Sequence, residues 1–297
     1  TARRGRAAMA LLTSAALALA AGAGIFAAIA AVVWTWDAGL PARTTARLSR
    51  ELCRPGRADE AVLREAGEAF LRAAVGPQAP FGRFARRVAG ASAGALAATT
   101  LVWFVATPGL PASFLSDAAS LKLVLRQLIL NGFVSTVLIT WASWALGGAR
   151  IGRLAAAEPG RLARHIGLDL LVRLALLAAL SAAIFALFAR HAGSFGGSVE
   201  TAVAVVPETL AGALAFRGLS GAQVYAALLT GFPWALLLLL RLAAAQPWVG
   251  ALWRRLGRRL PVAERPFRFL GLLLAAGCAA AGVAAALALR GLRDGGL

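Results

Sequence analysis

The chain has 297 residues, of which 60% are hydrophobic and 15% are charged, whereas an average soluble domain carries about 25% charged residues. This composition argues against a soluble globular protein. The 31 Lys and Arg residues outnumber the 13 Asp and Glu residues and give a formal charge of +18, which in a soluble chain would point to nucleic acid. Because the arginines alternate with long apolar runs, and no nucleic-acid-binding motif accompanies them, we expect no nucleic-acid partner.

Six apolar runs are long enough to be membrane crossings, because a helix needs about 20 apolar residues to cross a bilayer. We therefore predict an all-α fold, a polytopic integral membrane helix bundle that forms a single transmembrane domain over 1–297. The predicted crossings are about 7–36, 88–107, 121–147, 167–189, 222–244 and 267–290. A cytoplasmic amphipathic loop, 37–87, and an outer loop, 190–221, connect them. Pro233 is expected to kink the fifth crossing.

The basic residues predict the orientation of the bundle. In the six-crossing arrangement, 21 of the 31 basic residues fall in the connections 37–87, 148–166 and 241–268, which all lie on one side. The side rich in Lys and Arg is normally cytoplasmic. Six of the eight tryptophans lie near the same side, as expected of indoles at a membrane interface. We expect a bacterial inner (cytoplasmic) membrane, with anionic lipid on the cytoplasmic side.

Amphipathic segments flank the predicted crossings. Residues 59–75 form a predicted helix whose apolar stripe either packs on the protein's own cytoplasmic face or docks onto another subunit. Residues 248–260 are expected to form a helix that lies in the interface. Its predicted contacts with lipid headgroups are Arg254, Arg255, Arg258 and Arg259. On the outer side, residues 202–216 are predicted to lie on the outer leaflet or to dip into it.

Polar residues inside the crossings are the candidate functional groups, because burying them in lipid costs free energy unless they are paired. Asp169 and Arg173 can form an i,i+4 ion pair or contact a substrate or ion. Asp169 is expected at the cytoplasmic edge, so no crossing has a central carboxylate, which disfavours a proton-coupled pump. The candidates for a polar path or for interhelical contacts are Arg126, Gln127, Asn131, Ser135, Asp169 and Arg173. Gly90 and Gly94 are predicted to let helices pack closely.

Metal, cofactor and nucleotide sites are not expected. The two histidines, His165 and His191, are 26 residues apart, which is about 39 Å along a helix, too far to share a metal or a haem. Cys53 and Cys278 show no metal-binding spacing. The sequence contains neither a Gly-rich phosphate loop nor a dinucleotide fingerprint.

One five-residue motif bears on catalysis. Gly218-Leu219-Ser220-Gly221-Ala222 resembles the Gly-x-Ser-Gly-Ala turn that carries the nucleophile of rhomboid intramembrane proteases. In that family a later crossing brings a base histidine to the serine, whereas no histidine follows Ser220. The other interpretation is a small-residue helix entry with a capping serine, and we predict no enzyme activity.

The function expected from these patterns is that of a non-catalytic inner-membrane protein, a structural, accessory or scaffold subunit of a larger membrane protein complex. Its partners would be other membrane protein subunits. The alternative is a transporter or channel-forming permease subunit, energised by a separate partner, whose path runs along the polar third and the kinked fifth crossing. Solute flux that depends on Gln127 or Asn131 would favour the alternative.

Overall fold

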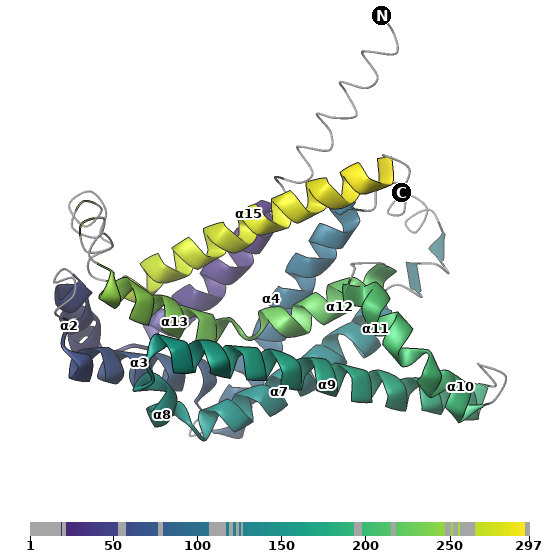
Figure 1. The fold of residues 1–297 in the computed structure, drawn as a ribbon, viewed down its shortest axis with the longest axis horizontal. Helices are drawn as coiled ribbons and strands as arrows, with labels where there is room; N and C mark the ends of the chain where they lie inside the picture. The colour runs from purple at the N-terminus through teal and green to yellow at the C-terminus, as the bar shows by residue number, and fades with distance from the viewer. Residues whose placement is uncertain are drawn as a thin grey trace, which may run out of the picture.

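A computed structural model of the chain describes residues 19, 22–52, 58–76, 80–106, 117–118, 121–122, 125, 127–192, 198–214, 218–246, 251, 255 and 265–294. In these ranges all regular structure is helical and no strand occurs, which confirms the predicted all-α class (Figure 1). The first helix, Gly22–Ala38, is followed by α2 (Ala42–Leu52), α3 (Glu60–Val75), α4 (Phe81–Ala106), the π-helix η1 (Gln127–Val134), α7 (Ser135–Gly148), α8 (Ile151–Ala155), α9 (Pro159–Ala192), α10 (Val199–Ala204), α11 (Val206–Leu214), α12 (Gly218–Leu229), α13 (Phe232–Ala245) and α15 (Pro266–Asp294).

Long apolar helices indicate a membrane protein, but six crossings are not confirmed. Among the described residues, Pro159–Leu187 of α9 and Pro266–Ala284 of α15 are long and apolar enough to cross a bilayer, and two bent helix pairs raise the number of spans to at most four. The first helix and α2 meet at 115°, and α12 and α13 at 46°. The third predicted crossing includes only a shorter apolar helix, which begins inside the π-helix. Hydrophobicity alone does not show where an apolar run bends, and the count of six crossings stays a prediction.

The two longest described helices that are also candidate spans, α9 and α15, run along opposite sides of the molecule, with α12 and α13 between them (Figure 1). The first helix packs antiparallel against α15, because a Cβ added at Gly271 would collide with Val33 and one added at Gly282 with Ile25. Close helix approach therefore occurs at glycines of α15. The predicted packing pair on α4, Gly90 and Gly94, makes no such close approach within the described residues, since a Cβ at either glycine would meet nothing within 4 Å.

A cluster of aromatic rings joins five helices near the C-terminal end of the first helix. Trp36 stacks on Phe232 at 4.9 Å between ring centroids, and its edge meets Phe70 at 6.0 Å and Trp144 at 5.8 Å. Phe70 in turn stacks on Phe267 at 4.5 Å. Trp36 and Trp144, two of the six tryptophans expected near the Arg-rich side, are buried in this packed cluster, and their level relative to a membrane stays a prediction.

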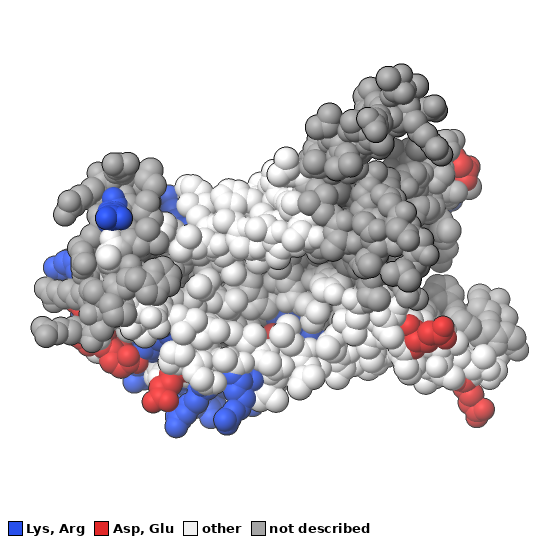
Figure 2. Space-filling view, turned by 45° about the horizontal axis from the view of Figure 1, so that its top comes forward, with Lys and Arg blue, Asp and Glu red and all other residues white. Residues whose placement is uncertain are grey.

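The helix predicted at 59–75 is present as α3, and it packs on its own chain. Its apolar stripe is buried, with Ala66 and Phe70 fully inaccessible, which decides between the two interpretations of that stripe in favour of internal packing. On the opposite face, Glu68 pairs with Arg64 at 3.1 Å and with Arg72 at 2.8 Å. Charged side chains gather at the end of the molecule formed by α2, α3 and α8, and a largely uncharged band adjoins it (Figure 2).

Candidate functional site

The candidate site lies at the interruption between helices α12 and α13, which we call the break. α12 ends at Leu229, and Pro233 lies in the first turn of α13, where a proline is tolerated because that N–H has no partner inside the helix. The 46° bend between the two helices agrees with the kink expected from Pro233. At the break, Gly231 donates its backbone N–H to Leu228 O at 3.1 Å.

A buried ion pair lies directly against this break. Arg173 Nε is 2.6 Å from Asp169 Oδ2, so the pair predicted from the i,i+4 spacing is present on α9. Both side chains are buried. A Cβ at Gly231 would lie 3.3 Å from Asp169 Oδ2 and 3.6 Å from Arg173 Nε. Glycine therefore lets the backbone of the break approach both charged groups.

The ion pair lies inside α9, beyond the exposed charged residues of its first turns. Arg164 is the last exposed charged residue before the pair, and the large apolar side chains of Leu168 and Leu171 beyond it are 56% and 62% exposed. Nine residues of helix place Arg173 about 13 Å beyond Arg164 along the axis. α9 begins at Pro159, eight residues before the predicted start of the fourth crossing, and the position of Asp169 at the edge of a crossing stays a prediction.

The guanidinium of Arg173 connects three helices. Its Nη1 donates to Ala227 O at 2.7 Å and to Thr230 Oγ1 at 2.5 Å, at the end of α12. Its Nη2 donates to Ser143 Oγ of α7 at 2.6 Å. Ser143 in turn donates a short hydrogen bond to Asp169 Oδ1. The charge of Arg173 is therefore compensated by a carboxylate and by three oxygen acceptors, as a buried charge requires.

A chain of hydroxyl groups extends this network to α4. Ser92 Oγ donates to Thr140 Oγ1 at 3.4 Å, Thr140 donates to Thr230 Oγ1 at 2.8 Å, and Thr230 donates to Ala227 O at 2.9 Å. Trp144 Nε1 also donates to Thr230 O, at 3.0 Å. We call the following set the break cluster: Ser92, Thr140, Ser143, Asp169, Arg173 and Thr230. Every member is at most 8% exposed.

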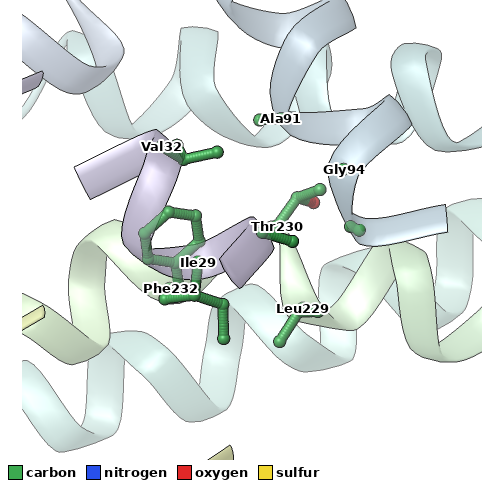
Figure 3. Close-up of a pocket in the computed structure, with 9 residues that line it drawn as sticks. Ile29, Val32, Ala91, Gly94, Leu229, Thr230 and Phe232 are labelled. Carbon is green, nitrogen blue, oxygen red and sulfur yellow. The ribbon is translucent and has the colours of Figure 1, made fainter. Parts of the chain in front are cut away.

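A small cavity adjoins the break on the side of α4 and the first helix. Figure 3 shows Thr230 and Phe232 from the break, Gly94 from α4 and Ile29 from the first helix among its lining residues. Its volume is about 10 Å³, which is close to the least space that one water molecule occupies. This cavity therefore has room for about one water molecule.

The chemistry of the break cluster is that of charge pairing and hydrogen bonding. The carboxylate of Asp169 is held by Arg173 and Ser143, so it does not stand free to activate a nucleophile. No group of three His, Cys, Asp or Glu residues in the described part of the chain could hold a metal ion. Ser220 of the rhomboid-like motif lies in the first turn of α12, which is the position expected if the motif only begins a helix.

The structure brings together only part of the residue set predicted from the sequence. Asp169 and Arg173 meet in the break cluster, whereas Ser135 is buried at the start of α7, outside the network described above. Arg255 is exposed. The η1 residues Gln127 and Asn131 have side chains that the structure does not describe, and the following residues lie outside the described ranges: Arg126, Arg254, Arg258 and Arg259.

Four members of the break cluster were not in the predicted site set: Ser92, Thr140, Ser143 and Thr230. Thr230 comes just before Gly231 and Pro233, so its position at a helix break could be predicted from the sequence. Its hydrogen-bond partners could not. Ser92 is a single hydroxyl in an alanine-rich run, where serine packs as a small residue as often as it bonds. Comparison with protein-family models, with curated proteins and with solved structures finds no match for this chain.

Proposed function

We propose that this chain is a permease subunit of a membrane transport system, with the break cluster as the closed centre of its path. The observation that carries the proposal is the contact between the helix break at Thr230 and Gly231 and the buried pair Asp169 and Arg173. Interrupted helices that meet ionisable groups inside the membrane are typical of transport proteins. Because apolar residues of similar volume hold helices together at least as well as a buried ion pair does, the charges favour a role beyond packing.

The proposed movement is a change of angle between α12 and α13. Thr230 accepts hydrogen bonds from Arg173 of α9 and from Thr140 of α7, and these bonds must break when the break between α12 and α13 moves away from α7 and α9. The polar groups released in this way would line the opened path. The break cluster would then bind the transported solute or ion in place of its internal partners.

The setting of this permease is inferred from the sequence. We infer a bacterial inner membrane, with the end formed by α2, α3 and α8 in the cytoplasm, because that end carries the Arg-rich connections. The energy would come from a separate protein, because the sequence has no phosphate-binding loop. The geometry of the break supports a permease subunit better than it supports a scaffold, because the break meets a buried ion pair.

The proposal is tested by solute exchange across membrane vesicles from cells that produce the chain, which keep a native energising partner in place. The vesicles are incubated with a mixture of metabolites and inorganic ions, and mass spectrometry identifies what crosses faster than in vesicles without the chain. Thr230→Val should lower that flux by about tenfold, because it removes the hydroxyl shared by Arg173 and Thr140. Thr100→Val is the matched control, since the Thr100 hydroxyl is buried without a hydrogen-bond partner among the described residues. Equal flux in both variants would contradict the proposal.

A structural subunit is the second candidate, and one observation favours it. The break cluster bonds mainly to itself and to Ala227 O, as interhelical contacts in a rigid scaffold would. Purification in mild detergent should then recover a stoichiometric membrane partner. If the break cluster only holds helices together, the Thr230→Val variant should still purify with that partner.

A further inference from the structure

The charged end of the molecule contains arginines in two different situations. On α2 and α3, Arg47 lies 2.7 Å from Glu65, and both Arg64 and Arg72 bind Glu68, whereas Arg43 and Arg50 of α2 are exposed. At the corner between α8 and α9 the arginines are exposed, and none is in an ion pair with an acid of the described residues. We call these four the corner arginines: Arg150, Arg153, Arg161 and Arg164.

Local packing turns the corner arginines outward. In α8, Ile151 and Leu154 are buried, so Arg153 between them lies on the exposed face. In the first turns of α9, Leu162 is fully buried, whereas Arg161 and Arg164 are exposed. Because only residues 156–158 separate α8 from α9, these basic groups belong to one corner of the surface.

The corner lies at the level where α9 leaves the charged end. Leu168, four residues after Arg164, is 56% exposed, and Leu171 is 62% exposed. Four residues of helix correspond to about 6 Å. Exposed leucines on a candidate membrane span face the hydrocarbon, so Arg161 and Arg164 stand at the depth of the lipid headgroups.

We propose that the corner arginines form a binding site for the phosphate group of anionic phospholipids in the leaflet on the Arg-rich side. Guanidinium groups bind phosphate oxygens through charge-assisted hydrogen bonds. None of the four is in an ion pair with an acid of the described residues, and the one acid of the connection between α8 and α9, the exposed Glu158, leaves the corner with a net positive charge. The site is on the surface, separate from the break cluster, and does not depend on the proposed transport function. The headgroup contacts predicted for 248–260 are a different set of residues.

The test is native mass spectrometry of the full chain released from nanodiscs that contain phosphatidylglycerol and phosphatidylcholine. The wild-type protein should retain phosphatidylglycerol preferentially. The triple substitution R153Q/R161Q/R164Q should lower that preference by about tenfold or more, since each arginine near a membrane surface contributes to the attraction. The matched control is R47Q/R64Q/R72Q, which removes the same charge from the same end of the molecule but takes only paired arginines, and it should stay within about twofold of the wild type.

Three results would overturn this site. The first is an unchanged preference for phosphatidylglycerol in R153Q/R161Q/R164Q, and the second is an equal loss in the control variant, which would mean that net charge alone attracts the lipid. The third is displacement of the lipid by excess inorganic phosphate, which would identify a site for free anions. Size-exclusion profiles identical to that of the wild type show that both variants are folded.

Discussion

Two Arg–acid pairs with the same spacing in the sequence have opposite surroundings in the structure. Arg173 and Asp169 on α9 are 2.6 Å apart, with side chains 0% and 7% exposed. Arg72 and Glu68 on α3 are 2.8 Å apart, with side chains 60% and 19% exposed. The spacing predicts that a pair forms but not what the pair does. The surroundings decide that, because solvent screens the α3 pair, whereas the α9 pair must find all its partners inside the protein.

The largest effect is expected from breaking the α9 pair. Arg173→Leu leaves Asp169 buried without its counter-ion and should lower the free energy of unfolding by about 3–5 kcal/mol, as measured by denaturant titration in mixed micelles. The double variant Asp169→Leu/Arg173→Leu removes both charges and should be less destabilised than the single one. A double variant that is destabilised by the sum of the two single effects would show that the charges do not interact.

Packing beside the break gives the next largest effect. A Cβ at Gly147 of α7 would collide with the buried ring of Trp234 in α13, so Gly147→Ala should cost about 1–3 kcal/mol of unfolding free energy. Gly90→Ala is the matched control, because nothing lies within 4 Å of its added Cβ. It should be neutral or stabilise α4 by about 0.5–1 kcal/mol. Equal losses in the two variants would contradict the close packing of α7 on α13.

The ion pair of Arg241 is intermediate in burial between the α9 pair and the α3 pair. The Arg241 side chain is 5% exposed, but that of its partner Glu60 is 70% exposed, with 2.5 Å between Arg241 Nη1 and Glu60 Oε1. It also donates to Ala155 O of α8. Arg241→Gln should therefore destabilise the protein by about 1–2 kcal/mol, less than Arg173→Leu. Thermal unfolding of both variants in the same detergent checks this order.

The smallest effect is expected at the exposed pair. Arg72→Gln should change the free energy of unfolding by about 0–1 kcal/mol, and high salt should reduce even this difference, because solvent ions screen exposed charges. If Arg72→Gln proved as harmful as Arg173→Leu, burial would not be what separates the two pairs. The same titration in low and high salt measures both quantities.

Local patterns predicted the parts of this structure that depend on neighbours in the sequence. The i,i+4 spacing indicated the pair of Asp169 and Arg173, and Pro233 indicated the break. Contacts between distant segments could not be predicted in this way, because Thr140 and Thr230 are 90 residues apart and a single threonine in an apolar helix does not reveal its partner. The number of crossings is not fixed by the apolar runs for a related reason, since the bends at Ala38 and at Thr230 lie inside or at the end of such runs.

Whether the break cluster opens to water is tested most directly by labelling Thr140→Cys with a membrane-impermeant maleimide, in a background where Cys53 and Cys278 are replaced by alanine. Thr140 is fully buried, so labelling requires the path to open. We predict that folded protein in sealed vesicles reacts slowly at this position, whereas Leu237→Cys, from the equally buried apolar core, does not react. A Thr140→Cys variant as unreactive as Leu237→Cys from both sides of the membrane would contradict a transport path through the break cluster and favour the scaffold.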